Sequence, residues 1–290
     1  MDSSKYNKKV NELPPPYDRH LPPLLAAAFA EDLPDVTGYA VFEEDAQVQA
    51  LLLAKTDGVI AGAPAFAAAF TFLDPSCQVD LLHGDGAPVQ RGDVVAVVAG
   101  RARAVLAAER TALNFIAHLS GVATLTRRYV DALTGTHCQV LDTRKTTPGW
   151  RALEKHAVRC GGGVNHRMGL FDAAMLKDTH LDACPSLADA VARVRARLGR
   201  HFPLVVECST LEMVREALAC EVEHIMLDNM GLEEMRHAVE EVGGRARLEA
   251  SGGITLANAA EVARTGVHFI SVGALTHSAP ALDLSLKVRR

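Results

Sequence analysis

The sequence predicts an α/β protein with two parts, a small N-terminal α+β domain and a larger C-terminal region built on a parallel sheet. The chain has 290 residues, which is enough for a barrel-sized domain with a smaller one attached. Between Thr37 and Gly100, short segments rich in β-branched residues are separated by Gly, Asp and Pro. From Cys138 onward, short apolar segments alternate with amphipathic helical segments, as in repeated βα units.

The composition excludes several classes of protein. Hydrophobic residues make up 49% and charged residues 22%, which is typical of a globular protein and not of a disordered or fibrous one. A net charge of −5 and an aromatic content of 5% argue against nucleic-acid and membrane-surface partners. The six cysteines form no C-x-x-C pair, and the sequence shows neither a signal peptide nor a membrane-spanning run. We therefore expect a cytoplasmic protein with no nucleic acid and no membrane as partner.

The N-terminal part is expected to begin with a loose arm, residues 1–20, and a short helix from Pro22 to about Glu31. One helix around 63–73 interrupts a series of strands, and a long helix from about 105 to 133 follows, with Gly121 as its expected break. The strands expected here are 39–44, 48–55, 59–62, 79–83 and 94–100.

The C-terminal part is expected to contain six strands. These strands are 138–142, 173–177, 204–208, 224–228, 246–251 and 268–273. The helices expected between them include 149–160, 186–198, 210–219 and 255–265. A complete (β/α)₈ barrel needs eight strands, so the region is either an incomplete barrel or an open doubly wound sheet.

Each predicted strand ends in a polar, charged or glycine residue. The strand ends are Asp142 to Lys145, Lys177, Glu207, Asp228-Asn229, Ser251 to Gly253, and Gly273. The carboxyl ends of parallel strands meet at one face, and in α/β folds that face carries the active site. The sequence therefore predicts one active-site opening at the carboxyl ends of the strands, here called the mouth, lined by cations, carboxylates and small residues.

Positive charge is concentrated between Asp142 and Lys177, where the sequence has seven basic residues and three acidic ones. Arg151, Lys155 and Arg159 fall within a predicted helix and are expected on its solvated face. The basic residues near strand ends, by contrast, are expected to bind a ligand with several negative charges. The basic and histidine residues near the strand ends are Arg144, Lys145, His166, Arg167 and Lys177.

Two glycine turns and two carboxylates complete the predicted mouth. The segments 251–254 and 271–275 each follow a strand and open a predicted helix, a pattern that favours a phosphate. Glu207 and Asp228 end neighbouring strands. They could pair with nearby Arg or Lys side chains, hold sugar hydroxyls, bind Mg²⁺, or stabilise a developing positive charge.

Several motifs resemble the quinolinate phosphoribosyltransferase family, and they follow in family order over nearly the whole chain after the arm. The N-terminal motif EDLPDVTG, residues 31–38, is a shortened form of the family's N-terminal EDL…D-x-T motif. The motifs are ERTALNF (109–115), LSGVAT (119–124), LDTRKTTPG (141–149), CGGGVNHRMGLFD (160–172), MLKDTH (175–180), VVEC (205–208), IMLDNM (225–230), EASGGI (249–254) and ISVGAL (270–275).

The resemblance implies that quinolinate and 5-phosphoribosyl-1-diphosphate form nicotinate mononucleotide, diphosphate and CO₂ with Mg²⁺, on the route to NAD. By motif match, Lys145, Glu207 and Asp228 would be catalytic, and the two carboxylates would also hold Mg²⁺, indirectly through the diphosphate. The residues implied to bind the substrates are Arg110, Thr143, Arg144, Lys145, His166, Arg167, Lys177, Glu207, Asp228, Ser251, Gly252, Gly253, Val272, Gly273 and Ala274.

The fold implied by the resemblance is an N-terminal α/β sandwich, 21–123, beside an open α/β barrel of about six parallel strands, 124–277. The C-terminal tail, 278–290, is expected to pack back on the sandwich. The resemblance further implies a homodimer or higher homo-oligomer in which Arg110 enters the neighbouring subunit's site. A paralogous phosphoribosyltransferase associated with molybdenum transport, a nicotinate-specific transferase and a non-catalytic sugar-phosphate sensor are the alternatives. A dicarboxylic substrate is favoured by the presence of all five residues implied to bind carboxylates, which are Arg110, Arg144, His166, Arg167 and Lys177.

Overall fold

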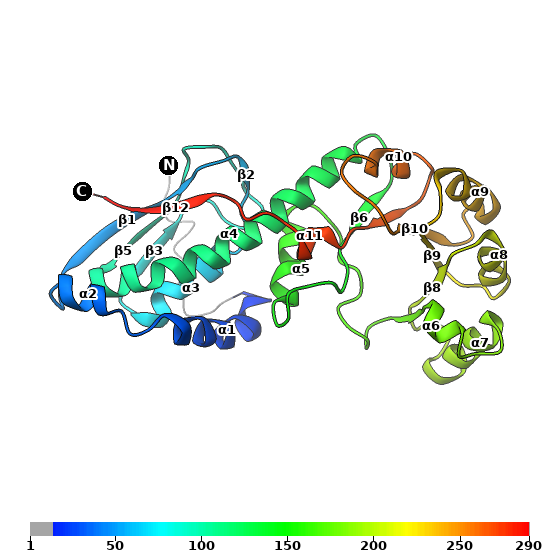
Figure 1. Cartoon of the computed structure of the whole chain (residues 1–290), viewed down its shortest axis with the longest axis horizontal. Coiled ribbons are helices and arrows are strands. Elements are labelled where there is room, and N and C mark those ends of the chain that lie inside the picture. Colours follow the sequence, from blue (N-terminus) through cyan, green and yellow to red (C-terminus); the bar gives the residue numbers. More distant parts are fainter. Residues whose placement is uncertain (1–13, 290) are drawn as a thin grey trace. The chain divides into compact units, whose positions relative to one another are not determined.

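The computed structural model describes residues 14–289, which divide into two compact units (Figure 1). The first unit combines the described residues up to Arg127 with 146–162 and the C-terminal segment from Thr276. The second unit combines 128–145 with 163–275. Most of the predicted arm, 1–20, lies outside the described residues, and the first helix begins at Tyr17.

The first unit contains a four-stranded antiparallel sheet with the strand order β12-β1-β5-β3. Its strands are β1 (Gln47–Ala54), β3 (Gln78–Leu81), β5 (Val94–Arg101) and β12 (Leu284–Val288), and β2 (Gly58–Val59) pairs separately with β4 (Pro88–Val89). Along β1, Ala50, Leu52 and Ala54 are buried while their neighbours are more exposed. This alternation gives the sheet one apolar face, because successive side chains of a strand point to opposite sides.

The helices of the first unit are α1 (Tyr17–Asp32), α2 (Val36–Val41), α3 (Ala63–Leu73), α5 (Arg151–Cys160) and the larger part of α4 (Ala102–Ala132). The prediction of a strand at 39–44 is wrong, because α2 covers its first half. Asp35 caps this helix, and its Oδ1 accepts hydrogen bonds from the backbone N–H groups of Thr37 and Gly38, each at 3.0 Å. The cap satisfies N–H groups at the helix start and overrides the strand preference of Tyr39 and Val41.

Helix α4 is continuous from Ala102 to Ala132, so the predicted break at Gly121 is wrong. A Cβ atom at Gly121 would lie 2.2 Å from the backbone oxygen of Pro280. Nearby, the N–H of Leu282 donates to the carbonyl of Ala117 at 2.9 Å. Glycine therefore occurs inside this helix because the C-terminal segment crosses it closely, and not because the helix ends there.

Helix α5 belongs to the first unit, although the sequence placed it within the barrel range 124–277. Glu154 is fully buried and contacts His118 of α4 at 2.8 Å, and the Trp150 ring stacks on Phe115 of α4. Lys155 is 1% exposed, so the prediction that it lies on a solvated face is wrong. The apolar spacing of α5 does not reveal that Glu154 and Lys155 are buried as well.

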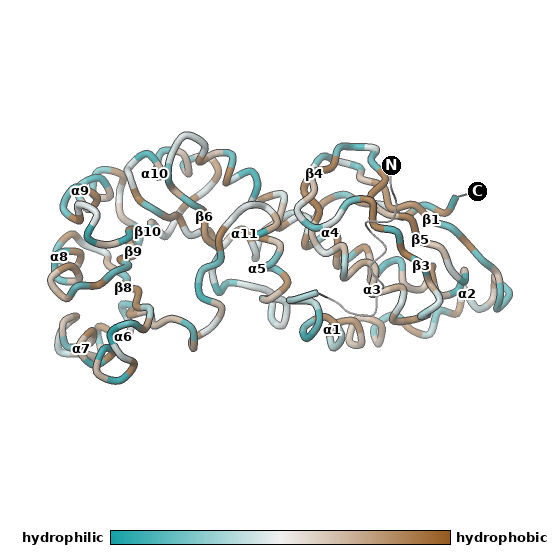
Figure 2. The backbone as a smooth tube through the Cα atoms, turned by 180° about the vertical axis from the view of Figure 1, so that it is seen from behind, coloured by the Kyte–Doolittle hydropathy of each residue, from teal (hydrophilic) through white to brown (hydrophobic). Residues whose placement is uncertain are grey.

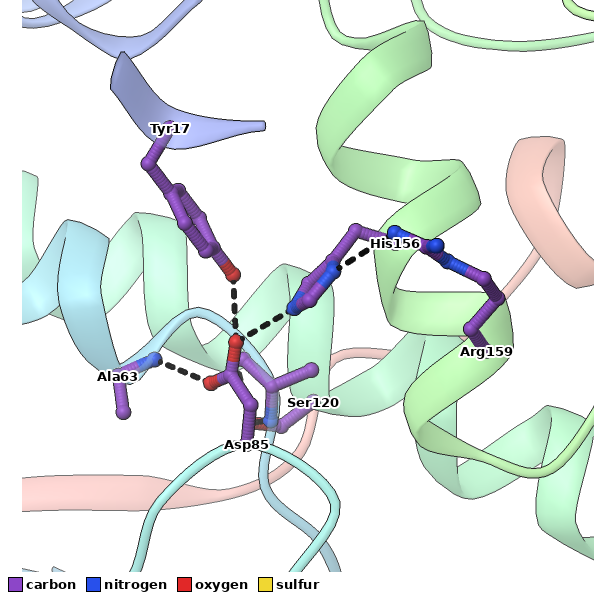
Figure 3. A network of polar contacts seen from close by, with 7 residues as sticks. Tyr17, Ala63, Asp85, Ser120, His156 and Arg159 are labelled. Atoms are coloured by element: carbon purple, nitrogen blue, oxygen red, sulfur yellow. Dashed lines mark hydrogen bonds and ion pairs between the residues drawn. The ribbon is translucent and has the colours of Figure 1, made fainter. Parts of the chain in front are cut away.

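A partly buried polar network joins three helices of the first unit (Figure 3). Asp85 lies in the loop before β4, and its Oδ2 accepts hydrogen bonds from the Tyr17 hydroxyl of α1 at 2.8 Å and from His156 Nε2 of α5 at 2.7 Å. Its Oδ1 accepts from the backbone N–H of Ala63 at the start of α3, at 2.9 Å. The His156 imidazole is about one-fifth exposed.

We expect the Asp85→Ala substitution to lower the free energy of unfolding by about 1–3 kcal/mol, because Tyr17, 1% exposed, would keep a buried hydroxyl without an acceptor. Urea unfolding monitored by circular dichroism measures the loss. The exposed Asp45→Ala variant is the control and should change stability by less than about 0.5 kcal/mol. Equal stability of the two variants would show that the network contributes nothing.

The second unit is a six-stranded parallel sheet with the order β6-β11-β10-β9-β8-β7. Its strands are β6 (Gln139–Leu141), β7 (Ala174–Leu176), β8 (Leu204–Cys208), β9 (His224–Asp228), β10 (Arg247–Ser251) and β11 (Phe269–Ser271). Strands β7 to β11 follow one another in chain order and β6 pairs with β11, whereas a doubly wound sheet reverses its order in the middle. The order is therefore that of a barrel left open between β6 and β7, and the predicted six-stranded α/β fold is confirmed.

Helices cover the outside of this open barrel (Figure 1). They are α7 (Leu187–Leu198), α8 (Leu211–Ala219), α9 (Leu232–Val242) and α10 (Ala259–Ala263), and the four-residue helices α6 (Asp178–Leu181) and α11 (Ala274–His277) follow β7 and β11. In Figure 2 they alternate between hydrophilic and hydrophobic residues, whereas β6 is largely hydrophobic. Such helices bury one face against the sheet. Within the described part of the chain, no helix is both long and apolar enough to cross a membrane.

Candidate active site

A pocket of about 310 Å³ lies at the carboxyl ends of the parallel strands, entirely within the second unit. Its walls combine four cationic side chains, three carboxylates, a histidine, hydroxyl groups and two methionines. The lining residues are Thr143, Arg144, Lys145, His166, Arg167, Met175, Lys177, Glu207, Met226, Asp228, Glu249, Ser251 and Ser271.

The structure brings most of the predicted site residues together. Those predicted and found in the lining are Thr143, Arg144, Lys145, His166, Arg167, Lys177, Glu207, Asp228 and Ser251. The predicted residues outside this lining are Gly252, Gly253, Val272, Gly273 and Ala274, which follow strands β10 and β11, and Arg110. Arg110 lies on α4 in the first unit, where its side chain is exposed, and within the described residues it forms no pair with Glu109.

The cationic wall of the pocket, formed by Arg144, Lys145, Arg167 and Lys177, comes from the segments that follow β6 and flank β7. Arg144 and Lys145 follow β6 directly, and Arg167 Nη1 donates to the carbonyl of Ala173 at 3.0 Å. Burial lowers the pKa of the Arg167 guanidinium, the positive charge of Arg144 lowers it further, and Asp172 acts in the opposite direction. Two guanidinium groups that repel each other in a half-buried pocket are suited to an anion that neutralises both.

The two predicted carboxylates have different local partners. Glu207, at the end of β8, pairs with Lys177 Nζ at 2.9 Å across the strand pair β7–β8. Asp228, the last residue of β9, accepts a hydrogen bond from the side chain of Asn229 at 2.9 Å. Asn229 adopts a positive φ of 53°, and its N–H donates to the carbonyl of Ser251 at 2.8 Å. Both carboxylates therefore face the pocket from rigid strand ends.

Gly252 is required by the close approach of β9 and β10. Its φ is +93°, and a Cβ atom at this position would lie 2.1 Å from Asn229 Oδ1. The helix expected at 255–265 is shorter in the structure, where α10 spans Ala259–Ala263 and five residues separate Gly253 from its start. Any anion held at this turn would contact backbone N–H groups of the turn and not the start of a helix.

Sequence reasoning missed four pocket residues, which are Met175, Met226, Glu249 and Ser271. Three of them lie within strands, whereas the predicted site residues were chosen from strand ends. Glu249 is paired in register with Met226, and Met226 with Glu207, so these three side chains form one inward layer of the sheet. A charged residue inside an apolar strand, as in RLEAS, was the available signal for Glu249.

Cys160 and Cys208 do not line the pocket. Cys160 lies in the first unit, and Cys208 is fully buried. Burial raises the thiol pKa of each to about 12, and the carboxylate of Asp85 adds to this effect at Cys160. Both are therefore protonated near neutral pH, and a protonated thiol is a poor nucleophile.

Comparisons with known proteins give a consistent result. Residues 35–120 match the family model "Quinolinate phosphoribosyl transferase, N-terminal domain", and residues 122–287 match the corresponding C-terminal domain. A probable nicotinate-nucleotide pyrophosphorylase [carboxylating] from Synechocystis is 48% identical over 83% of each chain. A protein of the same description from Bacillus subtilis is 43% identical over 91% of this chain and 92% of its own. The structure of the nicotinate-nucleotide pyrophosphorylase from Francisella tularensis has a TM-score of 0.89 at 36% identity, covering 97% of this chain and 99% of that chain.

Proposed function

The chain belongs to the quinolinate phosphoribosyltransferase family, and from this premise we propose that the pocket of its second unit is where the reaction takes place. The enzyme is a carboxylating nicotinate-nucleotide pyrophosphorylase of NAD biosynthesis. It joins quinolinate to 5-phosphoribosyl-1-diphosphate and releases diphosphate and CO₂, leaving nicotinate mononucleotide. The observation that carries the assignment of the site is the pair of neighbouring guanidinium groups, Arg144 and Arg167, in a pocket that also holds two strand-end carboxylates.

The quinolinate half-site is proposed to lie on the cationic wall. Arg144, His166, Arg167 and Lys177 would hold the two carboxylates of the substrate. Neutralising the repulsion between Arg144 and Arg167 would contribute to binding of a dianion. A substrate with a single carboxylate would leave part of this charge uncompensated, so the pocket favours a dicarboxylate over nicotinate.

The chemistry needs no nucleophile from the protein. The lone pair of the pyridine nitrogen forms the bond to C1 of the ribose as diphosphate leaves with the electrons of the C1–O bond. When the adjacent carboxylate departs as CO₂, its bonding electron pair stays on the ring carbon, where the positive charge of the neighbouring nitrogen stabilises it until that carbon is protonated. The pocket would act by holding both substrates in line and by stabilising charge.

Glu207 and Asp228 are proposed to bind the ribosyl-diphosphate half-site. Their oxygen atoms are the ligand type that Mg²⁺ prefers, and they line the same pocket from neighbouring strands. They would hold Mg²⁺ through the diphosphate, and the bound ion would offset the negative charge of the leaving group. Lys145 would face the diphosphate, while Ser251, Gly252, Gly253 and Gly273 would cradle the 5′-phosphate through backbone N–H groups. The adjoining turns contain three more residues that are proposed to bind the substrates, which are Thr143, Val272 and Ala274.

The assembly is proposed to be a homodimer or a larger ring of dimers in which Arg110 completes the partner's site. The exposed position of Arg110 on α4, outside the unit that holds the pocket, supports this proposal. A cytoplasmic location also stays a prediction.

One assay tests the proposed function. Purified protein mixed with quinolinate, 5-phosphoribosyl-1-diphosphate and Mg²⁺ should release equal amounts of nicotinate mononucleotide and CO₂. Nicotinate in place of quinolinate should give little product, and omission of Mg²⁺ should abolish turnover. Absence of product with all components present would contradict the proposal, and better turnover of nicotinate would favour the monocarboxylate alternative.

We expect Asp228→Asn to lower kcat by about a hundredfold, because the carboxylate that faces the ribosyl-diphosphate half-site loses its charge. Quinolinate affinity, measured by calorimetry, should stay within about twofold, since the cationic wall is unchanged. Asp182→Asn, an exposed residue of the same unit, is the control and should behave like the unmodified enzyme. Normal turnover of Asp228→Asn at saturating Mg²⁺ would make Asp228 a structural residue only.

A further inference from the structure

A buried carboxylate with no assigned role lies at the pocket. Glu249 is in the middle of β10, its side chain is 0% exposed, and it lines the cavity. Its Oε2 lies 2.9 Å from His224 Nε2 and 3.3 Å from His166 Nε2, both within ion-pair distance but without the alignment of a hydrogen bond. Burial alone would raise the pKa of Glu249, but the two imidazoles outweigh it and lower the pKa to about 2. Glu249 is therefore a carboxylate near neutral pH.

His166 connects Glu249 to the cationic wall. Its Nδ1 accepts a hydrogen bond from the backbone N–H of Arg167 at 2.7 Å, and its own backbone N–H donates to Asp142 Oδ1 at 2.9 Å. A ring nitrogen that accepts a hydrogen bond carries no proton, so the neutral imidazole has its proton on Nε2, the atom that faces Glu249. The Arg167 N–H thus sets the tautomer of the His166 ring, and the negative charge of Glu249 lies beside the Nε2 edge of that ring.

We propose that Glu249 is a positioning residue of the quinolinate half-site, acting through the His166 ring on the backbone of Arg167. This inference rests on the proposed function. Arg167 lies next to Arg144, whose charge repels it, and its guanidinium is held on the protein side by the Ala173 carbonyl. A group in such a position keeps its geometry only if the supporting residues are themselves fixed.

His224 is the second support of the same carboxylate. It lies on β9, is paired in register with Arg247 of β10, and contacts the same Glu249 oxygen as His166 does. Because His224 is absent from the pocket lining within residues 14–289, its contact with Glu249 serves to hold the carboxylate and not the substrate. The Glu249 side chain is therefore fixed from β9 while it orients His166.

The Glu249→Gln variant tests the proposal, because it keeps the size of the side chain and removes its charge. The KM and the calorimetric Kd for quinolinate should rise by about tenfold or more, since displacement of a binding group by even 1 Å can cost a hundredfold. The KM for 5-phosphoribosyl-1-diphosphate should stay within about twofold, because Glu249 contacts His166 and His224 and neither histidine belongs to that half-site. A merely structural role would instead change both KM values together, or only the fraction of active protein, and would overturn the proposal.

Two further variants keep the test decisive. Glu249→Asp retains the charge and should give a quinolinate KM between those of the unmodified enzyme and Glu249→Gln; if Glu249→Gln fails to fold, an unchanged quinolinate KM in Glu249→Asp overturns the proposal. Asp74→Asn removes a buried carboxylate of the first unit, which pairs with Arg101, and should leave both KM values unchanged. Failure of the unmodified enzyme to bind or turn over quinolinate would contradict the proposed function instead, so the two failures are distinguishable.

Discussion

Replacing Arg167 by alanine is expected to weaken quinolinate binding by about 2–5 kcal/mol, the usual cost of removing one partner of a buried, hydrogen-bonded charge pair. The substitution takes away a guanidinium that would donate two parallel hydrogen bonds to a substrate carboxylate. Arg144→Ala should have an effect of the same size. Arg167→Lys should weaken quinolinate binding less than Arg167→Ala does, because lysine retains the positive charge but cannot donate two parallel hydrogen bonds to one carboxylate.

The same substitution should change the stability of the fold much less. In the empty pocket, Arg167 is partly buried and lies beside Arg144, and both conditions disfavour its charge. Alanine removes this repulsion and gives up mainly the contact with the Ala173 carbonyl. Calorimetric titration with quinolinate and urea unfolding of the same samples separate the two quantities.

A matched control comes from an exposed arginine of the same unit. Arg193 of α7 pairs with Asp189 four residues earlier, and its side chain is 56% exposed. Arg193→Ala should leave quinolinate affinity unchanged, because surface ion pairs contribute little and this one is remote from the pocket lining. An unchanged Kd in folded Arg167→Ala and Arg144→Ala would remove these residues from the quinolinate half-site.

Hybrid dimers should regain activity when an inactive Arg110→Ala chain is combined with an inactive Lys177→Ala chain. In a closed two-fold dimer with shared sites, one of the two sites then receives Arg110 from one chain and Lys177 from the other. A purified hybrid should therefore show about half of the activity of the unmodified dimer, since one site of two is complete. Neither parent chain alone should be active.

The control for this experiment is a hybrid in which no site can be complete. An Arg110→Ala chain combined with a chain that carries both Arg110→Ala and Lys177→Ala should stay inactive. Tagging the two chains differently and purifying through both tags verifies the hybrid. If verified hybrids of the first kind remain inactive, Arg110 does not act across subunits.

The amino-acid sequence determined the fold class and most of the pocket. Repeated βα units predict a parallel sheet, and the carboxyl ends of such strands must meet at one face. Arg144, Lys177, Glu207 and Asp228 could therefore be grouped from their strand-end positions alone, and the structure places all four in one lining. This inference works because each strand, its direction and the residue at which it ends can be predicted from a short segment of the chain.

Only the tertiary structure decided which residues inside the elements meet. Glu249 lies in mid-strand, and its role depends on His166 and His224 from other parts of the unit. Glycine often marks the end of a helix, yet Gly121 lies inside α4 and leaves room for the C-terminal segment to cross it. Lys155 has the spacing of a surface residue, yet it is buried in the first unit. Local periodicity describes one element at a time, whereas burial and close approach depend on the partner that packs against it, which is distant in the sequence.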